Sequence, residues 1–103
     1  MSIDSEGVIL EANVHPIFWR PGTHQLIITR RQVTLRSGLL GKTELSIPIS
    51  KIQDVSIQYD VKGRMLGYGT IRIESAGRGD TEITAEYIKD PENVKRTILS
   101  LIK

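Results

Sequence analysis

Apolar and polar residues alternate along most of the chain. Between positions 82 and 87, for example, Ile83, Ala85 and Tyr87 alternate with two glutamates and a threonine. A period of two is typical of β-strands that bury one face. The pattern predicts seven strands, near residues 7–15, 24–29, 32–38, 42–49, 52–59, 69–76 and 81–88. Tyr59 and Tyr87 both fall on the inward side of this pattern.

Two segments depart from the alternation. Residues 61–67 are short and predict one irregular or helical turn. Residues 91–102 predict a helix, because Asp90 is a suitable N-cap and Pro91 suits the first helical position. Their apolar positions form one stripe at helical spacing, and a helix of this length needs a surface to pack on. The stripe consists of Val94, Ile98, Leu101 and Ile102.

Seven antiparallel strands followed by one amphipathic helix predict a mostly β fold. We expect a strongly bent sheet or partly closed barrel, with the C-terminal helix covering one open end, because a flat sheet would leave long edges exposed. A length of 103 residues fits one domain over 1–103, with residues 1–6 as a candidate flexible segment.

Composition removes several classes of protein. The chain has no cysteine, which excludes disulfides, thiolate metal sites and a thiol nucleophile. No apolar run approaches the roughly 20 residues of a membrane span, and acidic Asp4 and Glu6 do not suit a signal peptide. We therefore expect an unprocessed, soluble, cytoplasmic protein, with peripheral attachment to a membrane left open.

The charge is unevenly spread. Residues 20–51 carry a net charge of +5, whereas the whole chain carries only +2. This segment could present a positive face to an anionic partner, or its cations could be ordinary solvated positions on strands and turns. The sequence does not say whether these cations form one contiguous patch.

Three segments in order resemble the bacterial pleckstrin-homology-like domain, the second of the two common bacterial types. They are Ile28-Thr29 through Gly38-Leu39-Leu40, then Ile47-Pro48-Ile49 with Ile52-Gln53-Asp54-Val55, and Arg64-Met65-Leu66-Gly67-Tyr68-Gly69 with Ser75-Ala76-Gly77. The resemblance covers residues 24–102 and implies a seven-stranded bent barrel with a C-terminal capping helix. Many members carry a transmembrane hairpin between the first two strands. This chain has only residues 17–22 there, so any membrane role implied for it is peripheral.

Catalytic chemistry has little support in the sequence. His15 and His24 are the only histidines, and no third metal ligand of obvious spacing accompanies them. There is no nucleophile elbow, phosphate loop or zinc-protease motif. We expect no enzyme activity, no cofactor and no metal.

Two sets of residues are candidates for binding. Arg36, Leu39, Leu40 and Lys42 surround a predicted hairpin tip, where two leucines flanked by cations could enter a bilayer interface. Alternatively, one of these leucines caps the core. Trp19 and Arg20 are residue types favoured at binding hot spots, or they could close one mouth of the barrel.

These features favour a non-catalytic interaction module. We expect it to bind protein through an exposed strand edge or the Trp19–Arg20 rim, with self-assembly as one form of this. The alternative is peripheral binding to anionic membrane lipids through the hairpin tip. Nucleic acid is disfavoured as a partner, because the few aromatic residues are not interleaved with basic ones.

Overall fold

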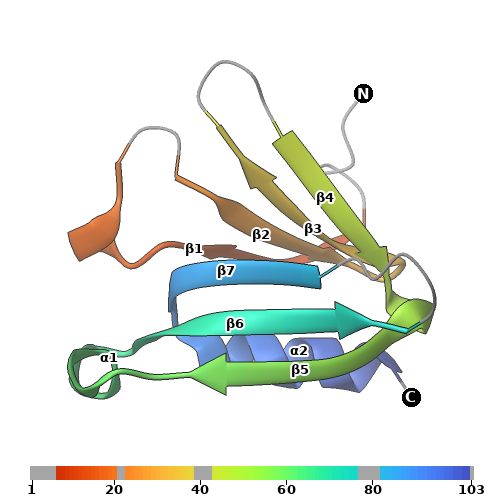
Figure 1. Cartoon of the computed structure of the whole chain (residues 1–103). Coiled ribbons are helices and arrows are strands. Elements are labelled where there is room, and N and C mark those ends of the chain that lie inside the picture. The colour runs from red at the N-terminus through yellow and green to blue at the C-terminus, as the bar shows by residue number, and fades with distance from the viewer. Residues whose placement is uncertain (1–6, 21–22, 39–42, 77–81, 103) are drawn as a thin grey trace.

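Two antiparallel sheets and a C-terminal helix make up the described part of the chain (Figure 1). The computed structural model describes residues 7–20, 23–38, 43–76 and 82–102. The strands are β1 (Val8–Asn13), β2 (Gln25–Thr29), β3 (Gln32–Ser37), β4 (Thr43–Pro48), β5 (Ile52–Gln58), β6 (Tyr68–Ser75) and β7 (Glu82–Lys89). The helices are η1 (Pro16–Phe18), η2 (Ile49–Lys51), α1 (Val61–Leu66) and α2 (Pro91–Ile102). All seven predicted strands and the predicted helix are confirmed.

The strands form two separate ladders in sequence order. One sheet has the order β1-β2-β3-β4 and the other β5-β6-β7, with every neighbouring pair antiparallel. Among the described residues, one isolated bridge joins them, between Val14 and Ile88. The closed form of the predicted barrel is therefore not confirmed. Between β4 and β5 the chain turns through η2, directly after Pro48, which lacks the N–H that a continuing ladder needs.

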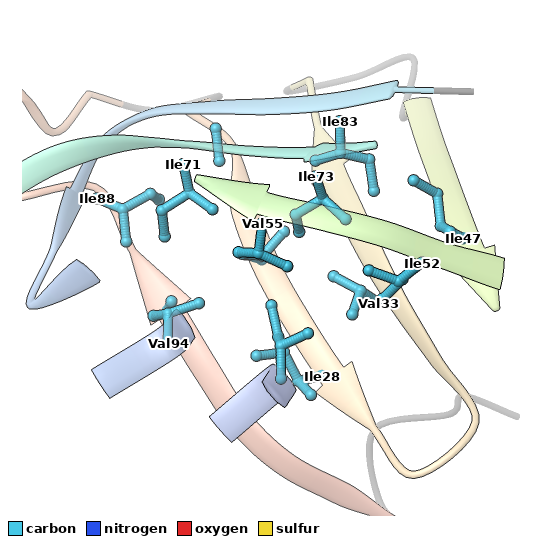
Figure 2. Close-up of a cluster of buried hydrophobic side chains, with 14 of the residues drawn as sticks. Ile28, Val33, Ile47, Ile52, Val55, Ile71, Ile73, Ile83, Ile88 and Val94 are labelled. Carbon is cyan, nitrogen blue, oxygen red and sulfur yellow. The ribbon is translucent and has the colours of Figure 1, made fainter. Parts of the chain in front are cut away.

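The inner faces of both sheets and one side of α2 share a single apolar interior. Figure 2 shows side chains from both sheets and from α2 converging there, including Ile28, Ile71 and Val94. Val94 and Ile98 are buried and Leu101 is half-buried, so the helix is docked as predicted. Each such aliphatic side chain contributes roughly 1.5–3 kcal/mol of burial. Ile102, also assigned to the stripe, is instead exposed at the end of the helix.

Three further local features complete the fold. Leu45 of β4 is exposed, because the β3–β4 hairpin projects beyond the second sheet (Figure 1). Asp90 precedes α2 but has a φ of 53°, outside the extended region that an N-cap residue adopts. Pro48 ends the edge strand β4, where a missing donor is tolerated.

Candidate functional site

A cluster of aromatic rings joins η1 to the second sheet. The Phe18 ring stacks on Tyr87 with centroids 4.1 Å apart, and meets Tyr68 edge-on at 5.0 Å. The His15 ring lies 5.5 Å from the ring of Tyr68. Aromatic pairs at these separations are each worth about 0.5–1.5 kcal/mol beyond simple burial. The cluster therefore holds the β1–β2 connection against β6 and β7.

Backbone hydrogen bonds fix the direction of η1. The His15 N–H donates to the carbonyl of Tyr87 at 2.7 Å, and His15 Nδ1 accepts from the Ile17 N–H at 3.3 Å. Because Phe18 turns toward the protein, its neighbours turn away. Ile17 and Trp19 are 56% and 57% exposed. Trp19 and Arg20, the predicted partner rim, thus both lie on the surface.

Tyr87 lies on the outer side of β7, so its predicted inward position is wrong. Gly69 pairs with Ile88 and Ile71 with Ala85, which leaves two residues of β7 opposite one residue of β6. This extra residue reverses the alternation. Tyr87 has a φ of 56°, a strained value for a bulky side chain that costs on the order of 1–3 kcal/mol. Its stacking on Phe18 offsets part of that cost.

The short helix α1 is locked in orientation at three positions. The Asp60 carboxylate accepts from the Gly63 N–H at 2.6 Å, and Gly67 ends the helix with a φ of 88°. A Cβ added to Gly63 would lie 2.5 Å from the carbonyl oxygen of Tyr68. No other residue could approach so closely without displacing backbone. The Gly63 side of α1 must therefore face the protein.

The outward side of α1 is apolar, which is the reverse of an ordinary surface helix. Val61 and Met65 are four residues apart, share a face, and are each 79% exposed. At about 100° per residue, Lys62 and Arg64 lie on either flank of that face. A surface helix normally turns its apolar stripe to the core and its charges to water. Leu66 adds a further exposed apolar side chain.

Tyr68 brings η1 and α1 to the same end of the molecule. Gly63 packs on its carbonyl and ring, while Phe18 packs on the ring from η1. Figure 1 shows both segments at that end. The exposed apolar residues there are called the apolar end, and they are Ile17, Trp19, Val61, Met65 and Leu66.

Four cations accompany the apolar end, and none of them forms an ion pair with another described residue. They are Arg20, Lys62, Arg64 and Lys89. Two acidic groups nearby have internal partners. Asp60 caps α1, and Glu92 accepts a hydrogen bond from the Tyr59 hydroxyl at 2.8 Å. The Arg64 guanidinium lies over the Tyr59 ring, 5.6 Å from its centroid, whereas no contact of this kind holds the other three cations among the described residues. Arg20, Lys62 and Lys89 are thus available to an external anion.

Two shallow hollows adjoin the apolar end. One, of about 500 Å³, lies beside Trp19 and is lined by Asn13, Val14, Pro16, Trp19 and Lys89. The other, of about 480 Å³, is lined by Tyr59, Arg64, Gly67, Asp90, Pro91 and Glu92. Burial, and then the hydrogen bond to Glu92, raise the pKa of Tyr59, so this phenol is a donor at neutral pH. Within residues 7–20, 23–38, 43–76 and 82–102, no three His, Asp or Glu side chains are grouped to hold a metal.

The basic segment at residues 20–51 does not form one patch among its described residues. The β2–β3 turn and η2 lie at the end opposite η1, joined by the Ile49 N–H donating to the Arg31 carbonyl at 2.8 Å (Figure 1). That end carries exposed Arg30, Arg31 and Lys51, far from Arg20. The charge asymmetry of the sequence is therefore divided between two ends.

The hairpin-tip candidate is only partly described. Arg36 is half-buried, and its Nε donates to Glu44 at 2.9 Å, so its charge is already paired. Leu39, Leu40 and Lys42 lie outside the described residues. The binding hypothesis for this tip stays a prediction.

A model of the family described as bacterial PH domain matches residues 9–102. The chain belongs to this family. The domain is also similar to the UPF0699 transmembrane protein YdbT of Bacillus subtilis, with 30% identity over 66 residues. That alignment covers 64% of this chain and 13% of YdbT, so the domain matches only a small part of the relative.

The domain has no match among solved structures. In the described ranges, none of its helices is both long enough and apolar enough to cross a membrane.

The sequence pattern did not single out the outward residues of α1. Apolar residues at i and i+4, as at Val61 and Met65, usually indicate a core-facing stripe. The signal that could have placed them is the pair Asp60 and Gly67, which brackets a helix of one and a half turns around a central glycine. Only the position of Tyr68 reveals that the glycine side is the one that packs.

Proposed function

We propose that this bacterial PH domain is a non-catalytic interaction module that docks through the apolar end. The observation that carries the proposal is the outward apolar face of α1, which Gly63 and Asp60 lock in place. Apolar clusters on a surface commonly mark interaction sites. The relative YdbT is named a transmembrane protein, which supports a place for this domain beside a membrane.

Energetics support a binding role for these residues. Covering a valine or methionine side chain completely is worth roughly 1.5–3 kcal/mol, and this energy is unused while Val61 and Met65 face water. Tyr68, on which α1 packs through Gly63, is itself packed within the aromatic cluster. A preorganised surface loses less entropy on binding than a flexible one.

Titratable groups near the apolar end are already hydrogen-bonded within the protein, which supports a binding role rather than a catalytic one. Tyr59 donates to Glu92, and Asp60 accepts from the backbone of α1. Catalytic groups must instead be free to reach a substrate from a pocket. The hollows beside Trp19 and Arg64 are therefore assigned to the docking surface.

Site-specific photo-crosslinking in living cells tests the docking surface. A photoreactive residue at Met65 or Ile17 should give crosslinked adducts, because both positions would face the partner. The matched control is Leu99, which is 48% exposed on α2 but lies outside the apolar end. Adducts at Leu99 as abundant as those at Met65, or none at Met65, would contradict the proposal.

Pairing through a strand edge is a second candidate, and it includes self-assembly. Among the described residues β4 is hydrogen-bonded only to β3, and a strand paired on one side can accept another chain by main-chain hydrogen bonds. Light scattering coupled to size exclusion measures this directly. A mass that stays at 11.5 kDa up to millimolar concentration would exclude self-assembly.

A further inference from the structure

We propose that the partner of the apolar end is the surface of an anionic lipid bilayer, with α1 as the element that enters it. This inference rests on the proposed docking function and adds the chemical class of the partner. It follows from the shape of the apolar end, the placement of its cations and the position of the single tryptophan.

The shape of the apolar end favours lipid over protein. Val61 and Met65 are each 79% exposed, so they protrude from the surface and do not line a groove. A protein partner would need a preformed pocket for each side chain, whereas acyl chains adapt to any convex apolar shape. The helix has six residues and is about 9 Å long, so it can lie within the interface but cannot span it.

The cations lie where lipid headgroups would meet them. Lys62 and Arg64 flank the Val61–Met65 face, and the long stem of Lys62 lets its charge remain at headgroup level while the helix face is buried. Arg64 holds its guanidinium over the Tyr59 ring, 5.6 Å from the centroid, at the other flank. Arg20 directly follows Trp19, and Lys89 lines the hollow beside it. Near an anionic surface each such cation strengthens binding by roughly fivefold.

The acidic groups beside α1 are placed to interfere little with its outward face. Asp60 points into its own helix to cap Gly63, and Glu92 is held by Tyr59. Asp90 and Glu92 line the hollow between α1 and α2, and neither is on the outward face of α1. The outward face of α1 therefore presents apolar and cationic side chains alone.

Trp19 supplies a direct measurement, because it is the only tryptophan in the chain. Tryptophan prefers the membrane interface, where its emission shifts to shorter wavelength. With vesicles of phosphatidylglycerol and phosphatidylcholine at low salt, we expect co-sedimentation and a blue shift. Brominated lipids should quench this emission. No binding and no shift with any vesicle at low salt would overturn the proposal.

The apolar part of the mechanism is tested by a double variant, Val61→Ser with Met65→Ser. Loss of two inserted side chains should weaken vesicle binding at least tenfold. The matched control Leu99→Ser removes an exposed apolar side chain outside the apolar end and should leave binding unchanged. Equal weakening by both changes would contradict insertion of α1.

The electrostatic part of the mechanism is tested by two double variants, each of which removes two positive charges. Lys62→Gln with Arg64→Gln should weaken binding to anionic vesicles about 25-fold, at roughly fivefold per cation. Arg30→Gln with Arg31→Gln removes the same charge from the opposite end and should change binding less than threefold. Comparable losses would show non-specific attraction without an oriented surface.

The vesicle and crosslinking results together separate the two proposals. Crosslinks from Met65 to protein, with no vesicle binding, would refute the bilayer as partner and leave docking through the apolar end in place. Absence of both crosslinks and vesicle binding would refute both proposals. Crosslinks from Met65 to lipid, with vesicle binding that depends on Val61, would support both.

Discussion

Tyr68 supports two surface segments at once. Its ring contacts Phe18 of η1 and His15, which precedes η1, and its carbonyl oxygen lies under Gly63 of α1. Tyr68 is almost fully buried, although the preceding residue, Gly67, is exposed. The arrangement of the apolar end therefore depends on close contacts at one aromatic residue and one glycine.

Replacement of Gly63 by alanine should destabilise the domain by about 2 kcal/mol. The new Cβ would lie 2.5 Å from the Tyr68 carbonyl oxygen, and overpacking of this kind typically costs about 1–3 kcal/mol. Urea unfolding measures the change. Gly67→Ala is the control, since its Cβ meets nothing but its φ of 88° costs about 1 kcal/mol. A smaller loss for Gly63→Ala than for Gly67→Ala would contradict the close approach.

Alkaline pH should destabilise the fold through two tyrosines. Burial, with Glu92 for Tyr59 and Asp60 for Tyr68, raises the pKa of each phenol above its ordinary value of 10.0. The folded state thus favours the protonated phenols. Their contribution to stability is complete below pH 10 and declines as the pH rises through the raised values.

Urea midpoints between pH 8 and 11 measure that decline. Tyr59→Phe should make it shallower, because one raised group is removed. An identical pH dependence in the variant and the parent would show that Tyr59 does not contribute.

At the scale of elements, the two α-helices bury opposite kinds of face. In α2 the stripe at Val94 and Ile98 packs on the sheets, so its residues were predictable from spacing alone. In α1 the packing side is a single glycine, and the apolar residues face outward. Spacing cannot distinguish these cases, because the choice depends on a contact with Tyr68 that is formed only in the tertiary structure.

Docking of α2 should make a large contribution to stability. Ile98→Ala removes a fully buried side chain and should lower the free energy of unfolding by about 3 kcal/mol. Leu99→Ala, on the exposed side of the same helix, should change it by less than about 0.5 kcal/mol. Equilibrium urea unfolding gives both values. Similar values for the two variants would show that the helix is not docked as described.

The outward face of α1 should contribute little to folding. Because Val61 and Met65 are 79% exposed, their joint replacement by serine should change stability by no more than about 1 kcal/mol. Thermal unfolding followed by circular dichroism checks this expectation. A larger loss would mean that these side chains pack against the domain and are not free for a partner.

At the scale of the molecule, the two sheets are separate in hydrogen bonding but continuous in their interior. Strand positions were predictable because alternation records which side chains reach the shared core, as at Ile71 and Ile73. Closure of the sheets into a barrel was not predictable, since it depends on whether neighbouring sheet edges pair. Tyr87 was predicted on the wrong side of its strand, because one extra residue in β7 reverses the alternation and no sequence feature indicates it. Within the apolar end only Trp19 was a predicted binding residue, together with the neighbouring cation Arg20.

A shared interior predicts that both sheets unfold together. Trp19 emission reports on the connection between β1 and β2, while far-ultraviolet circular dichroism reports on all strands. Since Ile28 and Ile71 belong to one core, the two signals should give the same urea midpoint and slope. Separated transitions would indicate that each sheet unfolds on its own.

The pairing of Asn13 with Gln25 has a consequence for how such domains can vary. These residues are register partners, so the chain leaves β1 and re-enters β2 at neighbouring points of the ladder. Extra residues placed between η1 and β2, beyond the packed part of this connection, would add chiefly loop-closure entropy, about 0.6 kcal/mol for each doubling in length. The scaffold can therefore accept a long insertion at this position with its strands undisturbed, and the inserted chain would emerge beside α1.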